Sequence, residues 1–565
     1  MGLLTDPNSG GGKASRLVSL VINHHRLLSW LLYIAGLVFL LGKRIFCWIY
    51  SIQRSYLSVL AHPIYNEKTY FSENALLPGL VTGGFNEQRA AVNFMSALEE
   101  ENKKYPGHAP FPWLEAQFKQ MGLEVHTQQF SLRYPLGNKT FTGTNLYAIL
   151  RAAKTSSTEA LVLSAPHRPP NSPHQATDAG IALLLASAKY FRSQIYWAKD
   201  IIFLITEHEW LGAQAWLEGY HGVSCGVEGV LEAGDLPARA GSIQAAINLE
   251  FSSEFPTHVN LKIEGLNGQL PNLDLINLVN RLVGREGMGG MFHEREETRQ
   301  PDSYKGYIRS LRTLLAMMGT QASGVPTGNH GLYHRFSIEA ITLEGVTRRS
   351  RKRPPGDFHT LGRIIEGTYR SLNNLLERFH QSFFFYLLPS GGRYVSIGLY
   401  MPMFGVLAAG LPITAVALWF SLLASPPEAR PPAPVTPPLL SAALPLILAS
   451  YCLGLLAHSL PGLAASLGAR VGLHPEEAVP LALGSLTLLL LLLPALPVKL
   501  ARVGGATVQC LACLQLSAIM AALSLYNISL AIFIAIPLVP LAILASQFSK
   551  WSIPRVILRY STQNH

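Results

Sequence analysis

The chain has 565 residues, of which 14% are charged, and a formal net charge of +10 at pH 7. Its mean hydropathy of +0.23 is too high for an ordinary soluble protein. Composition therefore excludes that class and predicts an integral membrane protein. The positive charge calls for no nucleic-acid partner, because lysine and arginine collect in the cytosolic loops of membrane proteins.

The amino-terminal part of the chain predicts a membrane anchor. Residues 1–26 are basic and precede an apolar stretch at 27–41. This stretch lacks a small-residue cleavage site, so we expect a retained signal anchor within residues 27–61 and a cytosolic amino terminus.

Residues 62–390 have the composition of a globular domain, with no apolar run long enough to cross a bilayer. Helical and strand patterns alternate along this region, which is typical of an α/β domain with a mixed sheet and helices on both faces. Hydrophobic periodicity assigns the individual elements. The predicted helices are 86–101, 178–191, 212–220, 270–282 and 310–318, and the predicted strands are 123–130, 160–165, 201–206, 245–249 and 340–343.

The carboxyl-terminal part predicts an α-helical membrane domain of about five spans at residues 395–545, followed by a polar cytosolic tail at 546–565. Most basic residues of its loops fall on the cytosolic side if the globular domain is lumenal. Asn138-Lys139-Thr140 is a glycosylation acceptor, as expected for a lumenal segment. The predicted spans are 395–423, 438–463, 478–496, 506–526 and 528–545.

Polar residues follow the carboxyl ends of the predicted strands, where the functional groups of such sheets gather. In chain order they occupy residues 164–168, 206–209, 248–250 and 328–331. This ordering resembles that of the zinc-dependent aminopeptidases with a co-catalytic metal pair. That family places there a His-x-Asp, a bridging Asp, a Glu-Glu pair, a further acidic ligand and a late His.

Carried onto this chain position by position, most of that metal-binding set is replaced. The His-x-Asp falls on Pro166-His167-Arg168, which places a cation where an anion is required. The bridging Asp falls near Ala176. The residues at the remaining positions are His208, Glu209, Glu250 and His330.

A zinc site needs at least three protein ligands, and neither half of the metal pair keeps that number. Glu209 and Glu250 are then hydrogen-bonded acids at strand ends, and His330 is a polar residue in a turn. The resemblance therefore implies a degenerate peptidase site without zinc. A single zinc on Glu209, Glu250 and His330 is the alternative. It would give an active metallopeptidase or a peptide-bond-forming enzyme of the aminopeptidase class.

Five strings of residues carry a second and narrower resemblance. They are MGLLTDP at 1–7, YFSENA at 70–75, QIYWAKD at 194–200, EGLNGQLPN at 264–272 and HQSFF at 380–384. They look like the GPI-anchor attachment proteins, which are subunits of GPI transamidase. The similarity runs to about residue 545. Residues 42–58 look like an insertion, and the polar residues 549–565 stand where the family continues into further membrane helices.

This resemblance implies a multi-pass protein of the endoplasmic reticulum membrane whose large domain is lumenal. The family works in a five-component complex that joins a GPI lipid to the carboxyl end of a substrate proprotein. A caspase-like subunit supplies the nucleophile there, so this chain is expected to bind the GPI lipid and orient its amine. The implied partners are the GPI lipid, the caspase-like subunit, the other transamidase subunits and substrate proproteins.

Two groups of residues flank the predicted spans and offer a place for the lipid head group. Tyr70 and Ser72 follow the first span, and His380, Gln381 and Ser382 precede the second. Their side chains can donate to phosphate or sugar oxygens, and the Gln381 carbonyl can join phosphate oxygens around Mg²⁺. Without the family resemblance, an interfacial helix cap with an aromatic belt is an equal expectation. A lipid transporter or scaffold outside any transamidase is a further alternative.

Overall fold

The computed structural model divides into two compact units, which we describe separately. The α/β unit comprises the described residues from 59 to 400. The helical unit comprises residues 27–34 and the described residues from Met401 onward. The structure describes residues 27–34, 59–134, 139–153, 157–169, 172–227, 229–297, 300, 303–348, 355–423, 438–492 and 502–548.

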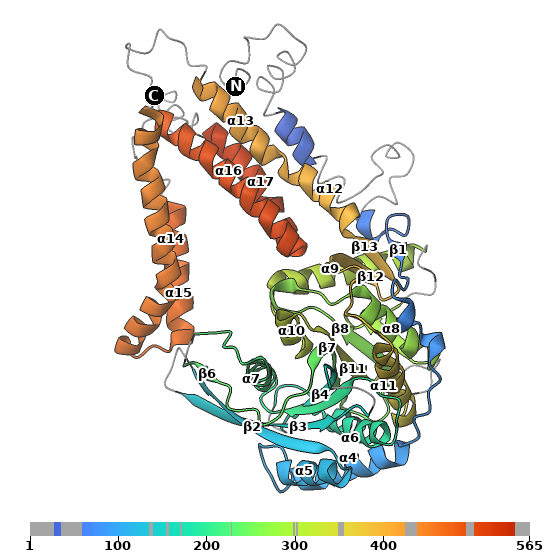
Figure 1. Cartoon of the computed structure of the whole chain (residues 1–565). Coiled ribbons are helices and arrows are strands. Elements are labelled where there is room, and N and C mark those ends of the chain that lie inside the picture. The colour runs from blue at the N-terminus through green and yellow to red at the C-terminus, as the bar shows by residue number, and fades with distance from the viewer. Residues whose placement is uncertain are drawn as a thin grey trace, which may run out of the picture. The chain divides into compact units, whose positions relative to one another are not determined.

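A ten-stranded mixed sheet forms the centre of the α/β unit (Figure 1), in the order β10-β9-β8-β11-β7-β4-β5-β3-β2-β6. The neighbours β11, β7, β4 and β5 are parallel, whereas β5 and β3 pair antiparallel. The sheet is therefore mixed, as predicted. The strands are β2 Glu124–Arg133, β3 Thr140–Leu150, β4 Glu159–Pro166, β5 Asp200–Thr206, β6 Leu231–Glu232, β7 Ser242–Glu250, β8 His258–Lys262, β9 Gly289–Phe292, β10 Arg295–Glu296 and β11 Glu339–Val346.

Alternate side chains of the central strands enter two separate apolar layers. On β5, Ile202 and Leu204 join a buried cluster that includes Trp216, whereas Phe203 lies 6.3 Å from the ring of Phe191. Successive side chains of a strand point to opposite faces, so both faces of the sheet are covered. Full burial of each such side chain contributes about 1.5 to 3 kcal/mol.

The helices cover these two faces and the ends of the sheet. Helices α4, α5, α6, α8 and α11 belong to one layer, and α7 and α10 pack on the other face. Asp357 caps α11 by accepting a hydrogen bond from the N–H of Thr360 at 2.9 Å. The helices are α4 Gln88–Asn102, α5 Phe111–Gln120, α6 Asp178–Arg192, α7 Trp210–His221, α8 Leu273–Arg285, α9 Tyr304–Ser323, α10 His330–Tyr333 and α11 Phe358–Asn373.

A second, three-stranded antiparallel sheet joins the two ends of the α/β unit. Its order is β1-β13-β12, with β1 at Glu67–Lys68, β12 at Tyr386–Ser390 and β13 at Arg393–Ser396. Glu67 is in register with Tyr394, and the hydroxyl of Tyr394 donates to the Glu67 carboxylate at 2.8 Å. Residues just after position 66 and just before position 397 are thereby held together.

The helical unit contains α12 Ile397–Ala408, which begins in the α/β unit, α13 Gly410–Leu423, α14 Pro438–Val471, α15 Pro475–Leu492, α16 Arg502–Tyr526 and α17 Ile528–Phe548. Three segments of the described residues are long and apolar enough to span a membrane. These are Ile397–Phe420, Ile447–Val471 and Thr507–Tyr526, and Ile528–Ile543 is a shorter apolar helix.

Residues 27–34 are helical, and polar contacts join them to the later helices of the same unit. The Ser29 hydroxyl lies 3.3 Å from that of Thr414, and the Tyr33 hydroxyl donates to the carbonyl of Ile536 at 2.8 Å. Cys510 and Cys513 are buried beside Ala415 as small packing residues. The predicted number of spans and their orientation remain predictions.

Every helix and strand predicted within residues 62–390 overlaps an observed element of the same type. The sequence patterns nevertheless missed β3, β8, α5, α11 and the small sheet. Residues 35–58 and 549–565 lie outside the described residues, as does the glycosylation acceptor Asn138. The predicted insertion at 42–58 and nearly all of the predicted tail are therefore not tested.

Candidate functional site

Two segments that are distant in the chain meet at two buried carboxylates, those of Asp274 and Glu73. They are the Tyr70 segment, residues 70–75, and the His380 segment, residues 380–384. Glu73 and Gln381, which contact each other, are 308 positions apart. Asp274, in the first turn of α8, accepts hydrogen bonds from the N–H groups of Ser72 at 3.0 Å and Glu73 at 2.9 Å. The side chain of Ser382 lies near the same carboxyl group and favours its charged form, which lowers its pKa. Asp274 thus holds the backbone of the first segment and lies near a side chain of the second.

Glu73 makes the second connection. Its Oε1 accepts the N–H of Gln381 at 3.2 Å and lies 3.3 Å from Nδ1 of His380. Glu73 is only 5% exposed, so a carboxylate here is stable only with such partners. The structure therefore brings together all five residues that the sequence placed at the lipid interface. We call this arrangement the Asp274–Glu73 cluster.

The buried carboxylates fix backbone groups, whereas several side chains of the cluster face outward. His380 and Gln381 are exposed. Tyr70 is 51% exposed, and its ring centroid lies 6.3 Å from that of Tyr394. The side-chain amide of Asn277 donates to the Tyr70 carbonyl at 2.8 Å. A fixed backbone with exposed hydroxyl, imidazole and amide groups is suited to binding a polar ligand.

The electrostatics of the cluster follow from burial and hydrogen bonding. Burial raises the pKa of Asp274, and the N–H groups of Glu73 and Ser72 oppose this shift by stabilising the carboxylate. The hydrogen bond to the Arg378 carbonyl raises the pKa of the exposed His380, with further support from the carboxylate of Glu73. Protonated His380 can donate to an anionic ligand.

Arg168 lies at the centre of the residues that the sequence predicts as a degenerate peptidase site. Its guanidinium donates to both carboxylate oxygens of Glu209, at 3.1 and 3.3 Å, and lies 3.2 Å from Oε2 of Glu250. Lys262 contacts the same oxygen of Glu250 at 2.9 Å. Two protein cations therefore neutralise the two acids that stand at the remaining metal-ligand positions and that the sequence predicts as hydrogen-bonded acids.

The two histidines of this site have separate environments. Nδ1 of His330 lies 2.8 Å from the Thr342 hydroxyl, and burial lowers the pKa of His330 well below its ordinary value. A Cβ placed on Gly328 would lie 3.2 Å from both Nδ1 of His330 and Oε1 of Glu250, so these two side chains lie close to the same glycine. His208 is exposed instead, with Nε2 3.1 Å from the carbonyl of Thr142.

The backbone after β5 also differs from a relaxed turn. His208 and Glu209 have φ values of 55° and 46°, in the left-handed region that non-glycine residues seldom occupy. This geometry, together with the Arg168 ion pair, fixes the direction of the Glu209 carboxylate.

The residues of the degenerate site do not fit zinc. Zinc binds thiolates, imidazoles and free carboxylates, whereas Glu209 and Glu250 are engaged by Arg168 and Lys262. A cation already within 3.3 Å of each acid would repel a second one. Within the described residues, no group of three or more His, Cys, Asp or Glu side chains has a metal-binding arrangement.

Comparison with known proteins places the chain in a family. Residues 142–563 match the family model described as Gaa1-like, GPI transamidase component. The chain belongs to this Gaa1-like family. It is 33% identical over 371 residues to the GPI transamidase component gaa1 of Schizosaccharomyces pombe, over 63% of this chain and 60% of the relative. It is 30% identical over 354 residues to GAA1 of Saccharomyces cerevisiae, over 62% and 53% respectively. The chain thus matches about three fifths or less of these curated relatives.

Solved structures resemble the chain more distantly. A putative zinc-dependent exopeptidase from Bacteroides vulgatus has 12% identity and a TM-score of 0.34, over 51% of this chain and 97% of its own. Glutaminyl cyclase from Porphyromonas gingivalis has 16% identity and a TM-score of 0.34, over 52% and 99%. These values carry no functional inference for the chain.

Sequence reasoning missed the residues that organise the Asp274–Glu73 cluster. Glu73 lies inside the string at 70–75, and Asp274 stands two positions after the string at 264–272. An Asn at position 272 ahead of an apolar periodic segment is a helix-start signal, and its side chain does accept the N–H of Asp274 at 2.9 Å. That signal predicts the helix, but it does not predict that Asp274 accepts hydrogen bonds from the Tyr70 segment.

Proposed function

We propose that this chain binds the GPI lipid through the Asp274–Glu73 cluster and positions it for transfer onto the carboxyl end of substrate proteins. In this role it supplies no nucleophile. Membership of the Gaa1-like family supports a part in GPI transamidase. The convergence of Ser72, Glu73 and Gln381 on buried carboxylates is the observation that carries the proposed site.

The cluster suits a phosphoglycan head group for chemical reasons. Tyr70 and His380 offer donors to phosphate or sugar oxygens, and the exposed Gln381 offers an amide oxygen that can join lipid phosphate oxygens around Mg²⁺. Mg²⁺ binds oxygen ligands and keeps several waters, so one protein oxygen plus phosphate is an adequate set. The metal would reduce repulsion between the phosphate and the nearby carboxylates.

Positioning is the catalytic contribution we assign to the chain. Holding an amine close to an acyl group in the correct orientation can lower a barrier by up to roughly 7 to 11 kcal/mol. A backbone fixed by buried carboxylates orients a ligand better than a loose loop does. The proposed partners are the GPI lipid, a caspase-like catalytic subunit, the other transamidase subunits and substrate proproteins.

We also propose that the chain resides in the endoplasmic reticulum membrane with its α/β unit in the lumen. The three segments long enough to span a membrane support a membrane location. Basic residues in the predicted cytosolic loops support this orientation.

Complementation tests the proposal. The chain and two double variants are expressed in cells that lack their own attachment subunit, and GPI-anchored proteins at the cell surface are measured. Tyr70→Ala/Gln381→Ala should lose rescue, because it removes two exposed ligand-facing groups and leaves the buried carboxylates in place. Glu209→Ala/His330→Ala should retain rescue wherever the protein accumulates normally.

The opposite pattern would support a metallopeptidase or peptide-bond-forming enzyme instead. Complex assembly is measured in parallel by co-purification of the catalytic subunit. If the Tyr70→Ala/Gln381→Ala chain assembles with the catalytic subunit but does not rescue, the defect lies in binding or positioning the GPI lipid. Rescue by that variant at the wild-type level would contradict the proposed site.

A further inference from the structure

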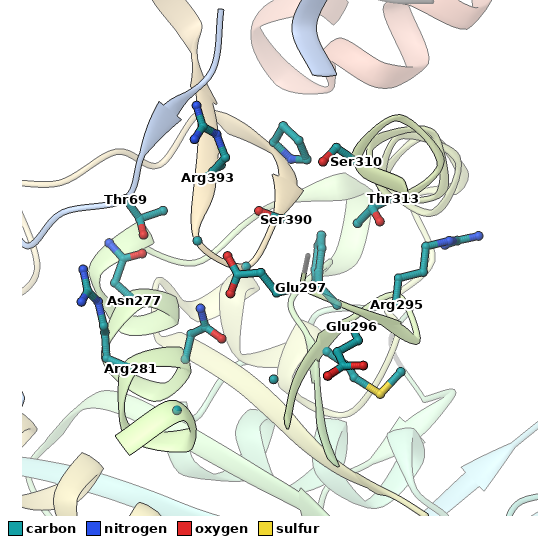
Figure 2. A pocket seen from close by; sticks show the side chains of 18 of the residues that line it. Thr69, Asn277, Arg281, Arg295, Glu296, Glu297, Ser310, Thr313, Ser390 and Arg393 are labelled. Carbon is teal, nitrogen blue, oxygen red and sulfur yellow. The ribbon is translucent and has the colours of Figure 1, made fainter. Parts of the chain in front are cut away.

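A polar pocket of about 530 Å³ lies within the α/β unit, and Lys68 and Thr69, just before Tyr70, line it. Its walls come from β1, the second half of α8, strands β9 and β10, α9 and the β12–β13 turn. Figure 2 shows Thr69 above Asn277 and Arg281 on one wall, with Ser310 and Thr313 on α9 opposite. The volume is within the usual range for small-molecule sites.

The pocket is rich in cations, and among the residues that the structure describes only Arg285 pairs with a carboxylate, that of Glu286 at 3.3 Å. Six basic side chains and two carboxylates line it. The side chains of Lys68 and Arg281 have no hydrogen-bond or ion-pair partner among the residues that the structure describes. Within the described residues, the Arg393 side chain donates only to the side chain of Asn66 and to backbone carbonyls. Such uncompensated cations favour an anionic ligand, and guanidinium groups match phosphate oxygens in pairs.

Neutral polar groups of the pocket are also without partners. In the described part of the chain, the hydroxyls of Thr69, Ser310 and Ser390 make no side-chain hydrogen bond. Asn277 is 2% exposed, yet its Oδ1 has no partner, because only its amide N–H₂ is used. Figure 2 shows this side chain directed toward the pocket. A buried polar atom without a partner is costly, and a ligand hydroxyl would satisfy it.

The carboxylate of Glu297 favours a ligand with hydroxyl groups, such as a sugar phosphate, over an inorganic anion. Its carboxylate reaches the middle of the pocket below Ser390 in Figure 2. It also lies against the β12–β13 turn, since a Cβ on Gly392 would clash with Oε1 of Glu297. A carboxylate repels phosphate but accepts hydrogen bonds from hydroxyls. Donors and acceptors in one pocket therefore match a ligand that has both a phosphate and hydroxyl groups.

We propose that this pocket binds a phosphorylated sugar. The phosphate lies against Lys68 and Arg281, and the sugar hydroxyls bind Glu297 and the amide of Asn277. The site is separate from the exposed Tyr70 and Gln381 side chains, although Asn277 contacts the Tyr70 backbone. The ligand is either a soluble sugar phosphate or the phosphorylated sugar head group of a membrane lipid, and the pocket chemistry is the same for both.

Calorimetric titration of the full-length chain in detergent tests the assignment. Glucose 6-phosphate should bind at least about tenfold more tightly than either inorganic phosphate or glucose, since each lacks half of the contacts. Lys68→Gln/Arg281→Gln should weaken this binding by at least about tenfold. The matched control is Arg312→Gln, because Arg312 is an exposed α9 arginine that does not line the pocket.

Equal binding of all three probes, or equal loss in the control variant, would overturn the proposal. Both altered side chains are exposed, so unchanged melting temperatures are expected and are measured for every variant. Glu297→Gln gives a second measurement: it should reduce the preference for glucose 6-phosphate over inorganic phosphate. An unchanged preference would also count against the assignment.

Two arms distinguish the sources of the ligand. The chain is reconstituted in phosphatidylcholine nanodiscs with or without phosphatidylinositol, and glucose 6-phosphate is titrated into each. Weaker apparent binding in the presence of phosphatidylinositol supports a lipid head group in the pocket. Equal binding that still depends on Arg281 supports a soluble sugar phosphate.

Discussion

The α/β unit contains two clusters of acidic residues whose partners differ in kind. At the degenerate peptidase site, Glu209 and Glu250 are held by the cations of Arg168 and Lys262. In the Asp274–Glu73 cluster, the carboxylates are held mainly by backbone N–H groups. The first arrangement neutralises charge within one site, whereas the second fixes the path of two distant chain segments.

This difference indicates which cluster retains a function beyond packing. A cation that satisfies two acids leaves them few free lone pairs for a ligand, so we predict a structural role for the Arg168 ion pairs. Carboxylates bound to N–H groups leave the adjacent side chains free to project outward. Substitutions at the Arg168 ion pairs should therefore change mainly the free energy of unfolding. Substitutions in the Asp274–Glu73 cluster should change both the free energy of unfolding and activity.

The largest expected effect is at Asp274. Asp274→Ala leaves the buried N–H groups of Ser72 and Glu73 without an acceptor, which should lower the free energy of unfolding by about 3 to 5 kcal/mol. Surface GPI-anchored protein should fall with it in the complementation assay. Asp235→Ala is the control because Asp235 is exposed. Normal rescue and an unchanged melting temperature for Asp274→Ala would remove Asp274 from its organising role.

The next effect is at Arg168. Arg168→Ala leaves Glu209 and Glu250 with fewer partners and should cost about 2 to 4 kcal/mol of stability. Adding Glu209→Gln should recover part of this loss, because the second change removes a charge that has become unpaired. Chemical unfolding of the single and double variants measures this coupling. Additive losses would show that Arg168 and Glu209 do not depend on each other.

A smaller, pH-dependent effect is expected at Glu339, which accepts the N–H of Asn272 at the start of α8 at 2.5 Å. Burial raises the pKa of Glu339 from 4.5 to about 7, against the opposing hydrogen bond. The folded chain then holds this proton more tightly than the unfolded chain does. Its contribution to stability is full below pH 4.5 and is lost as the pH rises through about 7.

Glu339→Gln should remove this dependence and raise stability above pH 7 by about 2 kcal/mol, since the side chain is partly exposed and therefore screened. Melting temperatures of both proteins across this pH range measure the difference. Parallel pH profiles would exclude Glu339 as the titrating group.

Periodicity predicted the central strands because they are buried on both faces and form continuous apolar runs, as β5 does from Ile201 to Ile205. It missed β3, whose first residues are exposed and whose later ones are buried. It also missed α11, although Asp357 provides a helix-start signal. Short strands such as β1 depend on partners more than 300 positions away, which no local pattern records.

The candidate site was predicted only in part for the same reason. The strings at 70–75 and 380–384 marked Tyr70 and Gln381, but their meeting point depends on the tertiary position of Asp274. The sequence showed that Arg168 stands where the aminopeptidase pattern requires an acidic metal ligand. Only the structure shows its contacts with both Glu209 and Glu250. The basic pocket has no sequence signature, because Lys68, Arg281 and Arg393 are scattered along the chain.

The pairing of β1 with β13 has a consequence for biosynthesis. The α/β unit cannot complete its small sheet until the ribosome has made residue 394, just before the apolar segment Ile397–Phe420. Closing so long a loop is entropically costly and slow. During translation, residues 67–73 must therefore remain available for most of the unit's synthesis, and a chaperone that covers this segment would favour correct assembly.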